Sequence, residues 1–231
     1  MQEIAAAIRK HSAFLVTAHV NPEGDSLCSQ LAMKELLEAL GKTVTIINHD
    51  VVPRHYTFLP KIGSIGTCGG PAPAFDAVVV LDCPTMKRVG CVEKLVPEGT
   101  PVINVDHHIS NQRFGTVNWV DAEASSAGEM VYRLFKELGV KITKEAALYL
   151  YIAILTDTGS FNYDNTSSVT HEIAGELLGY GLDPASVSES VFERRTVDDI
   201  RFLGMVLATL TVNKTGDVAY LEITRKMLEE T

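Results

Sequence analysis

Two short runs of almost continuous apolar residues most constrain the fold of this chain. They are Asp76–Asp82 (DAVVVLD) and Val102–Asp106 (VINVD). A strand with one face in water alternates apolar and polar residues, whereas a strand covered on both faces of a parallel sheet is apolar throughout. The two runs therefore predict central strands of a mainly parallel β-sheet with helices on both faces.

Further strand-like and helical segments alternate along the chain, as a doubly wound α/β fold requires. The segments Phe14–Ala18 and Thr43–Asn48 predict two more strands of the same sheet. Residues 53–75 are rich in Pro and Gly and predict a connecting loop. The spacing of apolar residues predicts helices over residues 25–40, 125–138, 145–155 and 169–178.

The last fifth of the chain has a different pattern. Pro184 opens a helical stretch that runs to about Leu210, and a hairpin pattern follows in TLTVN and VAYLEI. We therefore expect an α/β domain over residues 1–183, a linker helix over 184–211 and the start of a second α+β domain over 212–231. A hairpin and one helix cannot bury their own apolar faces, so we expect the chain to stop inside that second domain.

Charge and cysteine content exclude several classes of protein. The formal net charge is −9, and no basic stripe stands out that could grip long duplex DNA. The four cysteines form no CxxC pair, so we expect reduced thiols. The N-terminus does not resemble a signal peptide, and the longest apolar run, Ala146–Leu155, is shorter than the roughly 20 residues that span a bilayer. We expect a cytoplasmic protein with no membrane partner.

Acidic and imidazole side chains follow each predicted strand, at the end where open α/β sheets bind ligands. A single Asp at such a place is usually a helix N-cap. Several carboxylates that converge on the mouth of an apolar sheet repel one another unless a cation lies between them. The candidates are His19, Glu23 and Asp25 after the first strand, Asp82 after another, Asp106, His107 and His108 after a third, and Asp157 after a helix.

The residue types in this set indicate the class of cation. Carboxylates with a minority of imidazoles and no thiolate favour manganese or a similar hard divalent ion over structural zinc. The acidic groups are too many for one tetrahedral ion, and two ions sharing a carboxylate would use them all. Metal pairs roughly 3.5–4 Å apart activate a water and neutralise a phosphoryl group. The pattern predicts a two-metal phosphoesterase, with another divalent ion as the alternative to manganese.

These residues, in this order, resemble the motifs of the DHH family of phosphoesterases. The motifs are HVNPEGD from His19, the strand-end Asp82, the triplet Asp106-His107-His108, and TDTGSF around Asp157. The resemblance covers about residues 14–165 and implies a RecJ-like core. The segments ASSAGEMVYRLFKELG and AILTDTGSFNYDNT most resemble the branch of short-oligoribonuclease and 3′-phosphoadenosine-5′-phosphate phosphatase enzymes, the nanoRNases.

The resemblance also implies a role for each residue. His108 would be a catalytic residue that binds the substrate phosphate, and Asp106 would orient a neighbouring ligand. The first ion would be held by His19, Glu23 and Asp82. The second would be held by Asp25, Asp82, His107 and Asp157, so that Asp82 bridges the two ions. Residues 1–183 would be the DHH catalytic domain, and 212–231 the start of a truncated, DHHA1-like substrate-binding domain.

The implied activity is manganese-dependent hydrolysis of short single-stranded RNA or 3′-phosphoadenosine 5′-phosphate by a hydroxide shared between two ions. The alternatives are a cyclic-dinucleotide phosphodiesterase or pyrophosphatase on the same core, and a binding module with weakened catalysis. This chain has Glu23 where the family usually has Asp, and Cys28 where the family usually has Gly. These two differences support the binding module as an alternative. Asn111 and Arg113, just after the triplet, are further candidates for phosphate contact. A homodimer is left open, and we expect weak activity from a chain of this length.

Overall fold

The computed structural model describes residues 1–70 and 73–229. These residues form two compact units, Met1–Val187 and Ser188–Thr231. The first unit holds the large sheet and every candidate site residue, and the second holds a small hairpin between two helices.

A six-stranded, fully parallel sheet forms the centre of the first unit, in the order β3-β2-β1-β4-β5-β6. This confirms the predicted doubly wound parallel sheet. The order reverses between β1 and β4, and such a switch point opens a crevice at the carboxyl ends of the strands. The strands are β1 (Ala13–Thr17), β2 (Thr43–Asn48), β3 (Ile65–Thr67), β4 (Ala77–Leu81), β5 (Val102–Asp106) and β6 (Val117–Val120).

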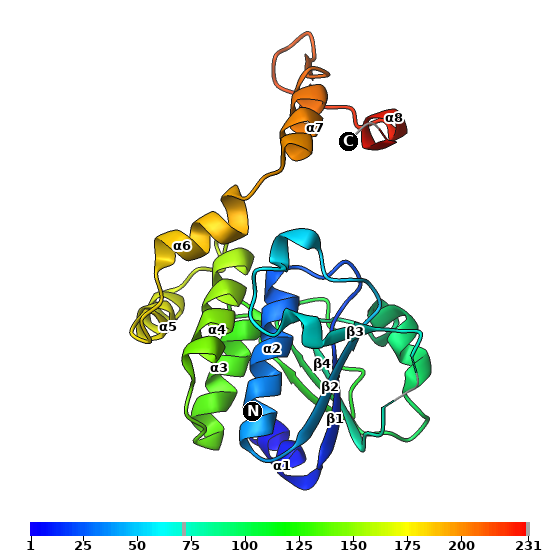
Figure 1. Ribbon diagram of the computed structural model, residues 1–231, viewed down its shortest axis with the longest axis vertical. Coiled ribbons are helices and arrows are strands. Elements are labelled where there is room, and N and C mark those ends of the chain that lie inside the picture. Colours follow the sequence, from blue (N-terminus) through cyan, green and yellow to red (C-terminus); the bar gives the residue numbers. More distant parts are fainter. Residues whose placement is uncertain (71–72, 230–231) are drawn as a thin grey trace. The chain divides into compact units, whose positions relative to one another are not determined.

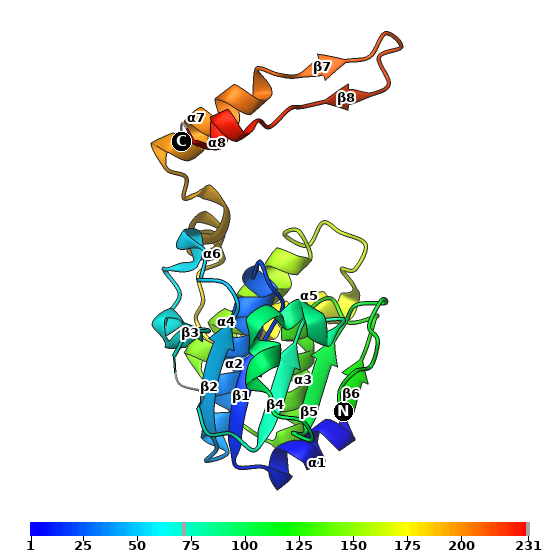
Figure 2. The same cartoon turned by 90° about the vertical axis from the view of Figure 1, so that its right-hand side faces the viewer.

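Helices α2 and α3 cover one face of this sheet, and α4 packs against both of these helices (Figures 1 and 2). On the other face, Leu15, Val78 and Val80 pack against Val89 and Val92 of the 3-10 segment η3. All five residues of β4 are buried because the strand is covered from both sides. The helical elements of this unit are α1 (Gln2–Lys10), α2 (Gly24–Ala39), η3 (Met86–Leu95), α3 (Ala127–Leu138), α4 (Lys144–Asp157) and α5 (Ser168–Leu178).

The two edge strands were not predicted. Strand β3 has only three residues, and all four residues of β6 are half-buried, so neither shows a continuous apolar run. The predicted loop over residues 53–75 contains β3 and two 3-10 turns, η1 (Arg54–Tyr56) and η2 (Ile62–Ser64). Residues 71–72 of that loop lie outside the described residues.

Cys68 and Cys91 form a disulfide that joins the segment after β3 to η3, with their Cα atoms 6.3 Å apart. The expectation of reduced thiols is therefore wrong for these two residues. Cys28 and Cys83 are free thiols, both buried. The paired cysteines are 23 residues apart and meet because both pack against the core cluster beneath η3. This proximity depends on tertiary packing and has no signature in the spacing.

The expected continuous linker helix over residues 184–211 is wrong. The chain forms α6 (Pro184–Ser188), a π-helical turn (Glu189–Glu193) and a separate helix α7 (Val197–Leu207). The break occurs because the Thr196 hydroxyl caps a new helix by accepting a hydrogen bond from the Asp199 N–H at 3.1 Å.

The predicted hairpin is confirmed, since β7 (Thr211–Val212) pairs antiparallel with β8 (Ala219–Tyr220). Helix α8 (Arg225–Glu229) follows, and residues 230–231 of the expected second domain lie outside the described residues. Over residues 1–70 and 73–229, no helix has both the length and the apolar character needed to cross a membrane.

Candidate metal centre

The candidate ligands come from four chain segments at the carboxyl edge of the sheet. His19 lies two residues after β1, Asp82 follows β4 directly, and His107 follows β5. Asp157 is the last residue of α4. Asp82 adopts a φ of 51°, in the left-handed region that L residues rarely occupy. Backbone conformations of this kind cluster at functional sites, where surrounding contacts hold them.

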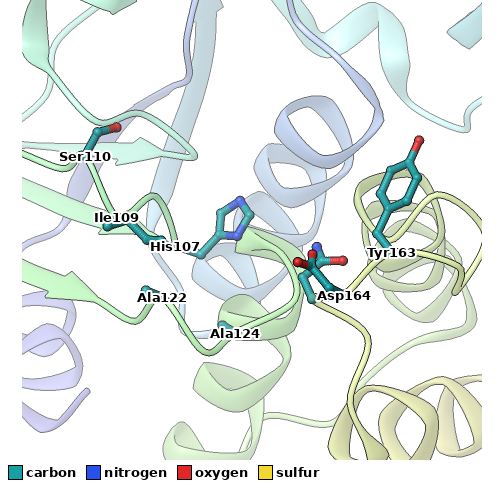
Figure 3. A pocket seen from close by; sticks show the side chains of 8 residues that line it. His107, Ile109, Ser110, Ala122, Ala124, Tyr163 and Asp164 are labelled. Carbon is teal, nitrogen blue, oxygen red and sulfur yellow. The ribbon is translucent and has the colours of Figure 1, made fainter. Parts of the chain in front are cut away.

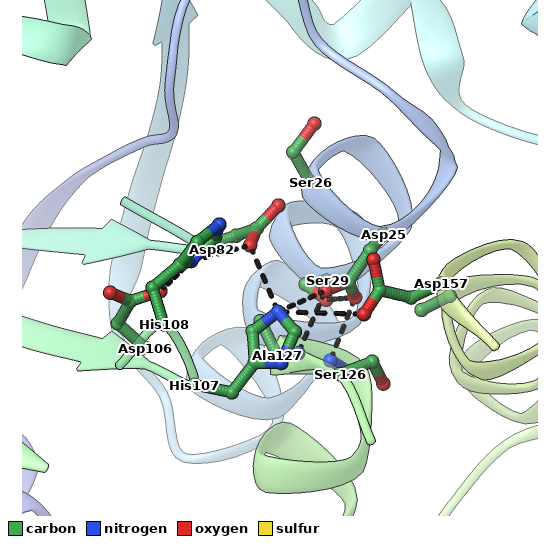
Figure 4. Close-up of polar contacts among 12 residues, drawn as sticks. Asp25, Ser26, Ser29, Asp82, Asp106, His107, His108, Ser126, Ala127 and Asp157 are labelled. Atoms are coloured by element: carbon green, nitrogen blue, oxygen red, sulfur yellow. Dashed lines mark hydrogen bonds and ion pairs between the residues drawn. The ribbon is translucent and has the colours of Figure 1, made fainter. Parts of the chain in front are cut away.

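His107 lies at the centre of the site, facing three carboxylates (Figure 4). Its Nε2 atom lies 3.5 Å from an oxygen of Asp82, 3.5 Å from one of Asp157 and 3.9 Å from one of Asp25. Hydrogen bonds between nitrogen and oxygen span about 2.7–3.2 Å, so these groups approach one another without bonding directly.

Asp82 faces two imidazoles with its two oxygens. Oδ1 lies 3.5 Å from His107 Nε2, and Oδ2 lies 3.2 Å from His19 Nε2. The Nδ1 atom of His19 donates a hydrogen bond to the Val20 carbonyl at 2.6 Å, which leaves Nε2 free as a ligand atom. A carboxylate that points its two oxygens at different imidazoles has the arrangement expected of a bridging ligand.

Asp25 is held in place by the first turn of α3. Its carboxylate accepts hydrogen bonds from the backbone N–H groups of Ala127 at 2.7 Å and Gly128 at 2.9 Å, and from the Ser29 hydroxyl at 2.8 Å. The amino end of a helix stabilises a negative charge. Residues about 100 positions apart thus fix one carboxylate at the edge of the crevice.

A second network lies behind the triplet. The Nδ1 atom of His108 donates to Asp106 at 2.7 Å, and the amide of Asn111 donates to the other oxygen of Asp106 at 2.6 Å. The same amide also donates to the side-chain oxygen of Asn104 at 2.8 Å. The Asn111 amide is therefore engaged in holding Asp106, and Arg113 is exposed.

Burial and mutual repulsion set the electrostatics of the carboxylates. Burial raises the pKa of Asp25 well above its usual range, and the charges of Asp82 and Asp157 raise it further. Burial likewise raises the pKa of Asp157 to about 6. Burial also acts to raise the pKa of Asp82, but the contacts with His107 and His19 outweigh it and lower the pKa to about 2.

His107 carries the compensating charge. Burial acts to lower its pKa, but Asp82, Asp25 and Asp157 outweigh burial and raise the pKa to about 10. The imidazolium partly neutralises the three carboxylates, and a cation bound through Nε2 would displace its proton.

The donor set fits a divalent cation. Two ligands of one ion, each at roughly 2.0–2.2 Å, lie at most about 4.4 Å apart. The separations around His107 Nε2 are 3.5–3.9 Å, longer than a hydrogen bond and within that limit. Two groups of three residues have ligand atoms within 4.8 Å of one another: Asp25, His107 and Asp157, and Asp82, His107 and His108.

Two expected ligands of the first ion lie outside these groups. His19 contacts Asp82, but neither His19 nor Glu23 joins a three-residue group within the described part of the chain. Glu23 is the N-cap residue of α2, and its backbone N–H donates to the Ser26 hydroxyl at 2.9 Å. The side chain of Glu23 is exposed, and its charge still acts on Asp157.

Three contributors to the site were missed by the sequence analysis. Asn104 is the one polar residue inside the apolar run VINVD, and this interruption was an available signal. Ala127 and Gly128 act through backbone N–H groups, which no pattern of side chains reveals.

One family model and several known proteins match most of this chain. A sequence profile described as "DHH family, N-terminal domain" matches residues 13–154. The bifunctional oligoribonuclease and PAP phosphatase NrnA of Thermus thermophilus is 35% identical over 201 residues, which are 87% of this chain and 60% of that protein. The protein of the same name from Bacillus subtilis is 26% identical over 217 residues, which are 93% and 67% of the two chains.

Among solved structures, an exopolyphosphatase-related protein from Bacteroides fragilis superposes with a TM-score of 0.91 at 24% identity. The match covers 100% of this chain and 72% of that one, and at this identity it concerns the fold. The chain spans 60% of the length of the Thermus relative.

Proposed function

This chain belongs to the DHH family, and on that premise we propose that it is a divalent-metal-dependent phosphoesterase. Its substrates are short oligoribonucleotides or 3′-phosphoadenosine 5′-phosphate. One observation carries the proposal: His107 Nε2 has carboxylate oxygens of three residues within 3.9 Å, at the switch point of a parallel sheet. Such an array, buried and acidic, favours a cation and a phosphate bound to it.

Two ions and their ligands form the first part of the proposal. Asp25, Asp82, His107 and Asp157 would hold one ion, and His19, Glu23 and Asp82 would hold the other. Manganese suits a set of carboxylate and imidazole donors without thiolate. When bound, the ions supply an activated water and neutralise charge on the phosphoryl group.

The chain's own residues orient this chemistry. Asp106 accepts a hydrogen bond from the Nδ1–H group of His108, so the His108 Nε2 atom is free to contact a phosphoryl oxygen. Asn111 holds Asp106 from behind, which fixes the plane of the His108 ring. The first turn of α3 prevents Asp25 from rotating away.

Charge favours a small substrate. The net charge of −9 disfavours a long polyanion, so the attraction for phosphate comes from the metal centre itself. Two curated relatives that span 87% and 93% of this chain are named as bifunctional oligoribonuclease and PAP phosphatase, which supports the choice of substrate.

The test is an assay of the whole chain on four substrates: a diribonucleotide, 3′-phosphoadenosine 5′-phosphate, a cyclic dinucleotide and pyrophosphate. We expect hydrolysis of the first two with manganese, and a loss of at least about 100-fold with a chelator. A Glu98→Gln variant serves as control, because this exposed carboxylate precedes β5, at the amino end of the sheet and opposite the edge that holds the candidate ligands. Equal rates with and without chelator would contradict the metal requirement, and preference for pyrophosphate would contradict the substrate class.

A further inference from the structure

A cavity of about 530 Å³ opens beside the metal centre, with His107 in its wall. Figure 3 shows Ile109 and Ser110 on one side of His107, and Tyr163 with Asp164 on the other. Its volume lies in the range of roughly 300–1,000 Å³ that is typical of small-molecule sites. Its apolar lining includes Ile109, Ala122 and Ala124.

Two large apolar residues that line this cavity are exposed to solvent. The side chain of Ile109 is 92% exposed and that of Tyr163 is 59% exposed. A single exposed apolar residue needs no explanation, but an aromatic and an aliphatic side chain that line one cavity offer a surface for a planar ligand.

Contacts within its own loop fix the position of Tyr163. Its ring lies against Gly159, where a Cβ atom would overlap it. The preceding Gly159, Ser160 and Phe161 have φ values of 55°, 61° and 63°, a left-handed run that is costly for the two non-glycine residues. The backbone N–H of Tyr163 donates to the Thr158 carbonyl at 3.0 Å.

The same loop is tied to the ligand segment. The amide of Asn165 donates to the Asp157 carbonyl at 3.1 Å and to the Ser125 carbonyl at 2.9 Å. The loop thus begins at a candidate metal ligand and returns to it, with Tyr163 and Asp164 at its tip. These anchors place Tyr163 and Asp164 in the wall of the cavity that His107 also lines.

Asp164 adds a carboxylate to the wall of the cavity. Its exposed carboxylate lines the cavity and would repel a phosphate, but it accepts hydrogen bonds from hydroxyl groups. An aromatic ring with an acceptor beside it matches a base with its ribose, since bases stack on tyrosine whatever their sequence.

We propose that this cavity binds the nucleoside part of the nucleotide whose phosphate lies at the metal centre. Tyr163 stacks on the base and Asp164 accepts a hydrogen bond from a ribose hydroxyl. The inference rests on the proposed function, because it takes the phosphate to be at that centre. This subsite binds the base and the ribose, which the metal ligands alone do not contact.

The test compares two ligands that differ only in the base. Calorimetry on the whole chain with manganese measures the binding of adenosine 5′-monophosphate and of ribose 5-phosphate. We expect wild type and Tyr163→Phe to bind the nucleotide about tenfold or more tightly than the sugar phosphate. Tyr163→Ala should lose that difference, whereas Tyr180→Ala, a tyrosine away from the cavity lining, should keep it.

A second comparison isolates the sugar. Wild type should prefer adenosine 5′-monophosphate to its 2′,3′-dideoxy analogue, and Asp164→Ala should not. If wild type binds both ligands of the first pair equally, or binds neither, the base-stacking part of the proposal is wrong. The same result with the second pair would overturn the role of Asp164. A preference that the corresponding alanine variant retains would overturn the same part of the proposal. Because these are binding measurements, a chain that binds the base yet hydrolyses no substrate would contradict the proposed function and leave the subsite supported.

Discussion

Among single residues, Asp82 occupies the most constrained position of the metal centre. It is buried, adopts a left-handed backbone conformation, and directs its two oxygens at His19 and His107. Asp106 is also buried, but its oxygens accept from His108 and Asn111. The two carboxylates therefore differ in their contacts: Asp82 faces the proposed cation site, and Asp106 holds a histidine.

The substitutions Asp82→Asn and Asp106→Asn separate these purposes. We expect Asp82→Asn to bind fewer than two manganese ions per chain, because an amide cannot bridge two cations as a carboxylate does. Asp106→Asn should keep both ions and lose about 10–100-fold in kcat, as is typical when an orienting partner is removed. Metal analysis after dialysis and steady-state kinetics measure the two effects. Two ions retained by Asp82→Asn would refute the bridge.

The cysteines allow a check on the disulfide. Burial raises the pKa of the Cys83 thiol to about 12 and raises that of Cys28 well above its usual range, so neither should react with iodoacetamide in the native protein. In denaturant we expect two labelled thiols without reductant and four with it, measured by mass spectrometry. Four labelled thiols without reductant would show that Cys68 and Cys91 are not paired.

Among the helices, the crossing of α3 and α4 depends on Gly128. A Cβ atom there would overlap that of Ala153, and it would come within 3.3 Å of the Asp25 carboxylate. Close approach of the two helices therefore brings the first turn of α3 to Asp25. Packing between elements and the geometry of the site are linked at this one position.

Gly128→Ala should lower the free energy of unfolding by about 1–3 kcal/mol, because the helices must separate to admit the methyl group. Metal affinity should fall with it. Gly175→Ala is the matched control: nothing lies within 4 Å of a Cβ atom at this position of α5, so we expect a gain of roughly 0.5–1 kcal/mol. Urea denaturation and manganese titration measure both variants. A Gly128→Ala variant with wild-type stability would contradict this account.

Helix α5 is joined to α3 through Glu176. Its carboxylate accepts from the Tyr132 hydroxyl at 2.6 Å and pairs with Lys136, and these contacts lower its pKa below the usual 4.5. A lowered pKa in the folded state means that the stabilisation is present above pH 4.5 and lost as the pH falls through the folded value.

Glu176→Gln should therefore be less stable than wild type at pH 7, and the difference should shrink as the pH falls below 4.5. The effect should be small because the pair is exposed, and weaker in high salt. Chemical denaturation at several pH values measures it. A stability difference that stays constant from pH 7 to pH 4 would show that the charge of Glu176 is not its source.

For the whole molecule, the division after Val187 leaves the sheet and every candidate ligand within one unit. Its core covers both faces of β4, and it contains all members of the two groups of candidate ligands. The first unit therefore has what a separately folding metal-binding domain requires.

A chain ending at Val187 should unfold cooperatively and bind manganese with an affinity within about threefold of the whole chain. Circular dichroism during urea denaturation and a manganese titration provide the measurements. Loss of cooperative unfolding, or of metal binding, would show that residues 188–231 are part of the same folding unit.

The sequence by itself determined the parallel sheet and the residues at its carboxyl edge. Continuous apolar runs such as AVVVL indicate burial on both faces, and Asp82 and His107 follow such runs directly, so local patterns suffice. The short edge strands β3 and β6 lack these runs and were not predicted. The linker was predicted as one helix because its apolar spacing continues through the cap at Thr196.

Only the tertiary structure decided how these groups are held. Asp25 is fixed by the N–H groups of Ala127 and Gly128, Cys68 meets Cys91, and Tyr163 comes to line a cavity with His107. Each of these arrangements joins segments that are not neighbours in the sequence. Apolar periodicity records how deeply a residue is buried, but it does not record which distant residue it meets, because that depends on how complete elements pack together.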